Sequence, residues 1–445
     1  MKRARPLLCW FFLLASGLAA GAQDFGFGFG AADPPASSGG GLGASVGGEV
    51  RAAVIAYPGD FSGGPGKVSL GNIFSGALKF SAGASGVEAV IALSLTPVFD
   101  GAGSPVALDE AYLRGRFGSF TLEAGLLTLT WGKADSLGPL DVINPLDAAD
   151  LTGLSGLDDF ASLKIPRPLL HGTYHIGSWT KVEGVFVPWY QPAPLPAADS
   201  RWFPPAMKVM IDMLPSNTAP SYPGALDSLE YAQGGVRFTT TLGSADLGFQ
   251  YYYGRLATPA AILSFNASYT LDSISFEYNP YHQVGLDYAG VIAGFNLRVE
   301  GALNLTADLK GDDGQVYNPH AAWSAGFDRT LPGDIMLNLQ GSGTARLFND
   351  KLGGNPADIE AGTDPTATRI MAALSRSFFR GELEVRLAGI YEIEAEDFLL
   401  APGLTWTKGD ISLFFFAAFF GGDREGQFGQ YRDNHFLKLG LRTVF

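Results

Sequence analysis

The last eleven residues of the chain, HFLKLGLRTVF at positions 435–445, decide the fold class. One parity of this stretch is almost entirely apolar and holds Leu437, Leu439, Leu441, Thr443 and Phe445. The other parity holds both charged residues that follow His435, Lys438 and Arg442. A period of two is that of an extended strand, so one face of this strand suits hydrocarbon and the other suits water. A strand of a soluble sheet can alternate in the same way, but it rarely ends the chain on an aromatic residue.

The other end of the chain predicts export. Lys2, Arg3 and Arg5 form a basic region, residues 7–20 are apolar, and Ala20-Gly21-Ala22 is a small-residue cleavage site. We therefore expect a signal peptide over residues 1–22, cleaved near Ala22. An uncleaved anchor is the alternative, but the apolar run is shorter than the ~20 residues of a spanning helix. Cys9 lies inside this peptide, so the mature chain has no cysteine for disulfide or thiolate chemistry.

Composition favours many short strands. The chain is 47% hydrophobic and contains 59 Gly and 32 Phe, yet beyond the N-terminus no stretch is long and apolar enough for a spanning helix. Without the three basic residues of the signal peptide, the 30 Lys and Arg fall to 27 against 44 Asp and Glu, a net charge near −17. Such an acidic chain is a poor partner for nucleic acid.

Short and long connections alternate along the chain. Residues 23–40 are rich in Gly, Pro and Ser and predict a flexible periplasmic lead. From 41 to 445, short turns are expected at 84–86, 118–119, 177–178, 243–244, 294–295, 332–333, 379–381 and 408–410. Long loops are expected at 58–66, 100–105, 133–165, 191–228, 256–280, 311–319, 349–365 and 421–433, with a briefer one at 394–396. Short turns on one rim and long loops on the other are typical of transmembrane β-barrels, whose short turns face the periplasm.

We therefore predict an all-β, transmembrane antiparallel β-barrel of eighteen strands, with sixteen as the alternative. In the four segments 245–253, 297–306, 334–342 and 382–391, no charge falls on the apolar parity. Lys or Arg facing lipid at mid-bilayer would cost about 2–4 kcal/mol. Closure satisfies every backbone hydrogen bond in lipid, whereas an open sheet would not. Segment 411–420 is apolar on both parities, so one set of its Phe side chains is expected inside. A soluble multi-sheet protein is the alternative, but it would not need this asymmetry of loop length.

The polar parity predicts the residues that line the interior. They are Glu110, Arg114, Arg116, Glu123, His171, His175, Lys181, Glu183, Arg237, Asp246, Arg298, Glu300, Glu382, Glu384, Arg386, Lys438 and Arg442. Their signs nearly balance, so neither strong anion nor strong cation selectivity is implied. A zinc or hydrolytic site at the two histidines is an alternative. Four residues at ~3.3 Å each, however, place His171 and His175 about 13 Å apart, which is too far for one metal.

The segment 133–164 is the most distinctive internal stretch. It combines six Asp with nine Leu, Val and Ile side chains within a predicted loop. A loop this apolar is expected to fold over or into the barrel mouth and narrow it. We take Asp135, Asp141, Asn144, Asp147 and Asp150 as its constriction residues. Ca²⁺ binding is the alternative, although the acidic spacing of a regular calcium loop is missing. In the next long loop, WFPPAMKVMIDML at 202–214 predicts a short amphipathic helix at the mouth.

Several short motifs carry a resemblance. The order TLTWGKADS, LDVINPLDA, KIPRPLLHGTYHIGS, WTKVEGVFVPWYQPA and YNPYHQVGLDYAG resembles a family of uncharacterised Gram-negative outer-membrane channels. Distant relatives of that family include the alginate-export barrel and channels for hydrophobic compounds. The resemblance covers most of residues 107–305. The C-terminal Leu437, Leu439, Leu441 and Phe445 likewise resemble the signal that the barrel-assembly machinery reads in outer-membrane barrels.

The resemblance implies a porin-like channel in the bacterial outer membrane that lets small solutes diffuse passively. No cofactor, metal or enzymatic activity is expected; the expected partners are membrane lipid, the assembly machinery and the solute. One alternative is a transporter of hydrophobic or lipid-like compounds. Two alternatives belong to other functional classes: a surface adhesin and a barrel-embedded hydrolase. The hydrolase would need a Ser or Asp catalytic group beside His171 or His175.

Overall fold

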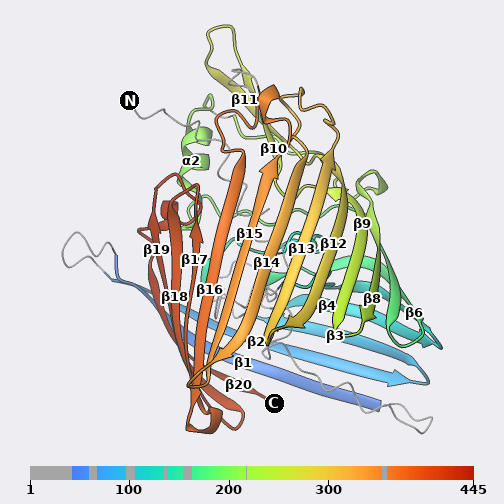
Figure 1. Cartoon of the computed structure of the whole chain (residues 1–445). Helices are drawn as coiled ribbons and strands as arrows, with labels where there is room; N and C mark the ends of the chain where they lie inside the picture. Colours follow the sequence, from blue (N-terminus) through green and yellow to red (C-terminus); the bar gives the residue numbers. More distant parts are fainter. Residues whose placement is uncertain are drawn as a thin grey trace.

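Eighteen strands form one closed antiparallel barrel in the computed structural model (Figure 1). The structure describes residues 43–59, 68–96, 106–134, 138–153, 163–216, 218–352 and 358–445. The predicted signal peptide and flexible lead at 1–22 and 23–40 lie outside the described residues. No helix among the described residues is long and apolar enough to cross a membrane.

The first nine strands of the barrel run from the start of the described chain to its middle. They are β1 (Gly43–Tyr57), β2 (Ser69–Ala84), β3 (Val87–Leu95), β4 (Val106–Phe117), β5 (Phe120–Leu127), β6 (Arg167–Ile176), β7 (Thr180–Val187), β8 (Gln233–Leu242) and β9 (Ala245–Arg255). The other nine are β12 (Pro280–Ile292), β13 (Phe295–Thr306), β14 (His320–Leu331), β15 (Ile335–Arg346), β16 (Thr366–Phe378), β17 (Leu383–Glu392), β18 (Asp397–Lys408), β19 (Ile411–Gly422) and β20 (Phe436–Val444). The count of eighteen is thus confirmed over sixteen.

The C-terminal strand closes the ring. β20 pairs with β1 in antiparallel register from Ala56 opposite Leu437 to Glu49 opposite Val444. Beyond the strand, Phe445 exchanges two backbone hydrogen bonds with Gly48, at 2.9 and 3.0 Å. A closed barrel has no free strand edge, which is what allows a sheet to stand in lipid.

Inside and outside alternate along β20 as its sequence predicts. Leu439 and Leu441 are exposed on the outer surface, whereas Lys438 is only 1% exposed in the interior. β9 and β13 behave in the same way: Phe249 and Val299 are exposed, and Gln250 and Glu300 are buried. The exterior is therefore apolar and the interior carries the charge, which is the arrangement of a transmembrane barrel.

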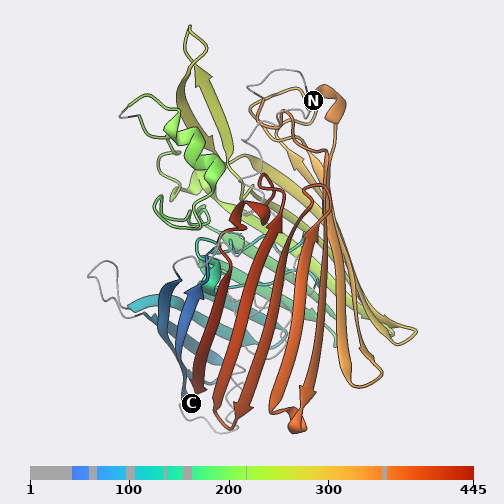
Figure 2. The same ribbon diagram turned by 90° about the vertical axis from the view of Figure 1, so that its left-hand side faces the viewer.

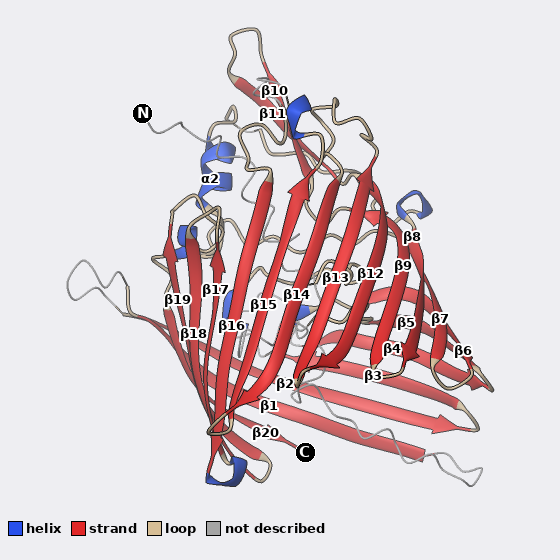
Figure 3. Ribbon diagram, in the orientation of Figure 1, coloured by secondary structure: helices blue, strands red, loops and turns tan. Residues whose placement is uncertain are grey.

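The two rims differ in loop length. All eight predicted short turns connect neighbouring strands on one rim, at the lower end of Figures 1 and 2. The long connections gather on the opposite rim, and strands make up almost all of the regular structure (Figure 3). We expected segment 256–280 to be one long loop. It instead contains the hairpin β10 (Ala260–Phe265) and β11 (Leu271–Glu277).

The predicted mouth helix is present as α2 (Pro205–Asp212). Its Met207 and Met210 pack with Ile274 and Phe276 of β11, so helix and hairpin form one apolar cluster above the long-loop rim (Figure 2). Inside the barrel, Phe416 and Phe420 of β19 are buried. The expectation that one set of Phe side chains in 411–420 fills the interior is therefore confirmed.

Candidate functional site

Between β5 and β6, the described residues 128–134, 138–153 and 163–166 fold into the barrel. Asn144 ties the two ends of this connection together: its Oδ1 accepts from Leu129 N at 2.9 Å, and its Nδ2 donates to the carbonyls of Leu127 and Ile165 at 3.2 and 2.8 Å. Glu110 also holds the first turn, accepting from Thr128 Oγ1 at 2.8 Å. We name residues 128–166 the inward loop.

Glu300 on β13 binds the backbone at the start of the inward loop. Its Oε1 accepts hydrogen bonds from the backbone N–H groups of Lys133 and Ala134, the latter at 2.7 Å. Gly132 has a φ of +102°, and Gly138 lies so close that a Cβ there would be 2.3 Å from Glu300 Oε2. Gly132 and Gly138 therefore allow the described backbone on both sides to approach one buried carboxylate closely.

A row of amide side chains continues this contact along the wall. Gln250 of β9 and Gln283 of β12 donate to the inward-loop carbonyls of Leu140 and Pro139, at 2.8 and 2.9 Å. Gln250 also donates to Gln283 at 2.9 Å, and Gln283 to Asn304 of β13 at 3.0 Å. Neutral donors and acceptors thus satisfy the loop backbone inside the barrel.

The other side of the inward loop packs on an apolar wall. Leu146, Leu151 and Leu163 share a buried cluster with Ile390 of β17 and Phe416 of β19. Lys438 of β20 donates to the carbonyl of Thr152 at 2.9 Å, and its Nζ lies 5.5 Å from the Phe416 ring. The loop therefore contacts both the β9–β13 wall and the β16–β20 wall, and it crosses the interior.

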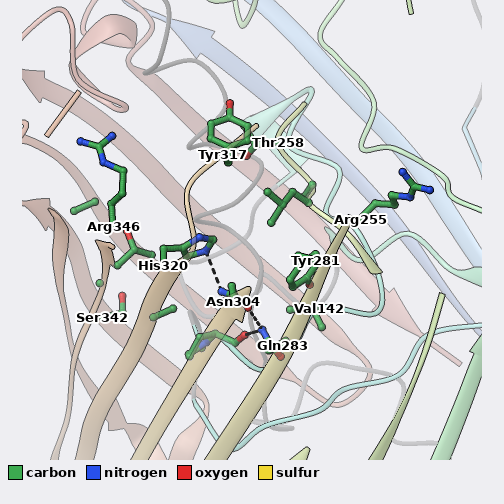
Figure 4. Close-up of a pocket in the computed structure, with 18 of the residues that line it drawn as sticks. Val142, Arg255, Thr258, Tyr281, Gln283, Asn304, Tyr317, His320, Ser342 and Arg346 are labelled. Atoms are coloured by element: carbon green, nitrogen blue, oxygen red, sulfur yellow. Dashed lines mark hydrogen bonds between the residues drawn. The ribbon is translucent and has the colours of Figure 1, made fainter. Parts of the chain in front are cut away.

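A cavity of about 270 Å³ lies on the long-loop side of the inward loop (Figure 4). Val142 and Asn144 of the loop line it, together with Tyr281, Gln283 and Asn304 from β12 and β13. His320 Nε2 of β14 accepts a hydrogen bond from Asn304 Nδ2 at 2.9 Å. Four arginines, Arg167, Arg255, Arg346 and Arg369, also line the cavity, with Glu360 as an acidic neighbour. This chamber is an amphipathic vestibule with a floor made by the inward loop.

One group of predicted interior residues meets on β4–β7. Arg114 donates to Glu123 at 2.8 Å and pairs with Glu88 at 3.1 Å. His171 lies between two carboxylates, 2.7 Å from Glu123 and 3.4 Å from Glu183, and Lys181 pairs with Glu183 at 3.0 Å. This is a carboxylate–imidazole–carboxylate arrangement, and neither ring nitrogen has a serine as its contact.

Other predicted residues form pairs elsewhere along the wall. Arg237 pairs with Asp287 at 2.6 Å, and Arg298 pairs with Asp328 at 2.6 Å. Arg442 lies 3.9 Å from Glu49. The structure places Asp246, Glu384 and Arg386 on strand positions that are partly exposed.

Three predicted residues lie near the short-turn rim rather than deep inside. Arg116 and His175 are exposed at the ends of β4 and β6. Glu382 differs from its expected strand position: it follows the turn 379–381 and is exposed. The turn takes one residue more than the sequence pattern indicates, because Phe379 and Arg380 both adopt positive φ there.

Most of the described acidic residues of the inward loop form contacts within the loop. Asp141 forms a buried ion pair with Lys164. Asp147 and Asp150 are exposed and accept from the backbone of Ala149 and Thr152, at 3.0 and 2.9 Å. Asp135 lies outside the described residues. Among the residues that the structure describes, no group of three His, Cys, Asp or Glu side chains is placed to hold a metal ion.

Sequence reasoning missed the uncharged part of this site. Gln250, Gln283 and Asn304 have the inward parity, but no charge or imidazole marks them in the sequence as candidates for chemistry. The sequence does contain a signal for these residues. Three amides at inward positions of neighbouring strands predict a row of side-chain hydrogen bonds.

The geometry defines a class: an eighteen-stranded transmembrane barrel whose interior is narrowed by one inward-folded loop. No family model matches the sequence, and the search of curated proteins found no match. Solved structures do match the fold. OccK9 (OpdG) of Pseudomonas aeruginosa is 10% identical over 90% of this chain and 98% of its own, with a TM-score of 0.53.

Two further structures give similar values. OccAB4 of Acinetobacter baumannii is 11% identical, and a BenF-like porin from Pseudomonas fluorescens Pf-5 is 8% identical. Each covers 90% of this chain and 98% of its own, with a TM-score of 0.50. The chain therefore has the fold of Gram-negative outer-membrane porins, and the predicted fold class is confirmed.

Proposed function

We propose that this protein is a porin-like channel of the outer membrane, through which small solutes diffuse passively. The observation that carries the proposal is the inward loop, which crosses the closed barrel. The loop forms the floor of a vestibule of about 270 Å³. Polar and charged side chains line both the vestibule and the β4–β7 wall, which favours a hydrated solute over a purely apolar one. The fold shared with porins supports the same function.

Export and assembly complete the proposal. A signal peptide ending near Ala22 would deliver the chain to the periplasm, and the alternating C-terminal strand ending in Phe445 would be recognised by the assembly machinery. The even strand count places both ends of the barrel on one side, and the short turns are proposed to face the periplasm. The interior charges predicted from the sequence are proposed to line the permeation path.

Single-channel conductance in planar bilayers tests the proposal. The intact mature chain is compared with a variant lacking residues 139–157, which include Leu146, Leu151 and Thr152 at the far wall. We expect a steady conductance for the intact chain and a larger one for the variant. As a control, shortening the separate β10–β11 hairpin by residues 266–269 should leave the conductance close to that of the intact chain.

Two results would contradict the proposal in different ways. Conductance only after the deletion would mean a plugged barrel that opens for particular solutes. No conductance in either protein, with both folded, would exclude a channel.

A further inference from the structure

Three cations stand on the outer, membrane-facing surface near the short-turn rim. They are Arg329 at the end of β14, Arg376 at the end of β16 and Lys408 at the end of β18, and all are exposed. Each has the outward parity of its strand, the parity shared with Trp323, Leu374 and Trp406 respectively. Charge on this face is unusual, because the outward positions of the barrel are otherwise apolar. We name these three residues the outer cation band.

The two arginines lie close together. Ladder pairing puts Arg329 opposite Leu337 on β15, and Leu337 opposite Leu374 on β16. Arg376 is two residues further along β16, toward the short-turn rim. With strands about 4.8 Å apart and about 3.4 Å per residue, the two Cα atoms are roughly 12 Å apart. Both guanidinium groups can therefore approach one molecule that lies against β14–β16.

Each arginine is stacked on an aromatic ring. The guanidinium carbon of Arg329 lies 4.4 Å from the centre of the Phe295 ring, and that of Arg376 lies 4.8 Å from the Phe378 ring. Phe295 in turn contacts Phe327 edge-to-face at 5.1 Å. Stacking holds the charged groups flat against the barrel at the level where aromatic side chains mark the membrane interface.

The salt bridges of the described residues include no partner for Arg329, Arg376 or Lys408. This contrasts with the interior, where Arg114, Arg237 and Arg298 all pair with carboxylates. The outer cations thus present positive charge that the described part of the protein leaves uncompensated.

The band is confined to one sector of the barrel. At the same rim, the other strands carry apolar or aromatic residues at outward positions: Val87, Phe117, Phe120, Ile176, Leu242, Ile292 and Ile411. A general need for cations at this interface would have distributed them around the ring. Their restriction to β14, β16 and β18 indicates a local ligand.

We propose that Arg329 and Arg376 of the outer cation band bind the phosphate of an anionic phospholipid, with the acyl chains lying along the apolar face of β14–β18. Basic side chains at a membrane surface attract anionic head groups, and arginine pairs with phosphate through two parallel hydrogen bonds. Leu337, Leu374 and Leu404 supply the apolar surface below the head group. The inference rests on the proposed function only in that it places this rim at the phospholipid leaflet that faces the periplasm.

The test counts lipids on the intact mature barrel in detergent by native mass spectrometry. Dioleoyl phosphatidylglycerol is titrated against the unaltered protein and against the double variant Arg329→Gln/Arg376→Gln. Each cation near an anionic surface contributes a factor of about five in affinity, so the tightest site should weaken about 25-fold. Arg376→Gln alone should weaken it about fivefold and serves if the double variant folds poorly.

A matched variant removes two exposed cations from the opposite rim, Lys310→Gln/Lys351→Gln, and should leave phosphatidylglycerol binding unchanged. Equal affinities in all three proteins would overturn the proposal. Displacement of the lipid by millimolar inorganic phosphate would also overturn it, because the site would then be one for a free anion. Neither result depends on conductance, so failure here leaves the channel proposal standing.

Discussion

Glu300 shows how one side chain fixes the course of the inward loop. It is 2% exposed, and it accepts from two consecutive backbone N–H groups that have left the β5 strand. Buried backbone donors need an acceptor, and a carboxylate can serve both at once. The residue was predicted to line the interior, but its partners lie 166 and 167 positions away in the chain, which no local pattern reveals.

Replacing Glu300 by alanine should loosen the inward loop. Two buried N–H groups would lose their acceptor, at about 1–3 kcal/mol each. We expect a lower free energy of unfolding and a noisier, larger single-channel conductance. Asp272→Ala removes an exposed carboxylate of the separate β10–β11 hairpin and should change neither. An unaltered conductance in Glu300→Ala would show that the loop is held by its other contacts alone.

Gly138 tests the same contact from the side of the loop. A Cβ at this position would lie 2.3 Å from Glu300 Oε2 and 2.5 Å from the Ala134 Cβ, so Gly138→Ala forces the carboxylate or the loop to move. Protease cleavage within the inward loop of the folded protein should become faster. Gly184→Ala on β7 is the control, since its Cβ would meet nothing within 4 Å. Equal cleavage rates for the two variants would contradict the close packing around Glu300.

At the scale of the strand, the sequence predicts most of what is observed. Alternation and turn residues predict eighteen strands and all eight short turns, because one face must meet lipid and each turn needs its own backbone geometry. The β10–β11 hairpin was missed, although AAILSF and LDSISFE are two strand-like runs separated by the Asn and Ser of NASYT. It escaped notice because it lies outside the alternation of short and long connections that organises the barrel.

The C-terminal strand offers a direct test of the lipid-facing parity. Leu439 is 55% exposed on the outer surface and pairs with Val54 across the closing seam. Leu439→Lys would place a charge in lipid, which costs up to about 2–4 kcal/mol depending on depth. Urea unfolding in lipid vesicles should show this decrease in the free energy of unfolding. The decrease for Leu439→Ala should be much smaller. Equal losses in the two variants would mean that this position does not face hydrocarbon.

At the scale of the whole molecule, the interior is divided into two halves. The β16–β20 side carries the largest apolar cluster, beside the buried Arg369–Glu392 pair. Trp202 covers this cluster at the mouth and contacts Tyr431 at 5.5 Å and Phe420 at 5.7 Å. The β4–β13 side carries the amide row and most of the ion pairs. The inward loop follows this division. Its leucines pack against β16–β20, and its backbone groups form hydrogen bonds with β9–β13. Sequence alone predicts that the loop folds over or into the barrel mouth. It does not predict which strands the loop contacts, because that depends on how the ring closes.

Pairing of the interior charges should make the channel weakly selective, with similar permeability for K⁺ and Cl⁻. The vestibule provides the sharpest test, because Arg346 and Glu360 both line it and lie 3.4 Å apart. Glu360→Gln should shift the reversal potential in a KCl gradient toward anion preference, and Arg346→Gln should shift it toward cation preference. A shift of the same sign in both variants would contradict a vestibule in the ion path.

The same pair gives the channel a pH dependence. Burial raises the pKa of Glu360 above its usual value, with Asp358 adding to the rise and Arg346 and the N–H of Asn318 opposing it. A raised carboxyl pKa means that the negative charge is lost as pH falls through a higher range than for an exposed glutamate. Acidifying from neutral pH should therefore move the unaltered protein toward anion preference before its exposed carboxylates titrate, and Glu360→Gln should lack that early step. If the variant shows the same early step, the titrating group lies elsewhere along the path, and the ion route does not pass Glu360.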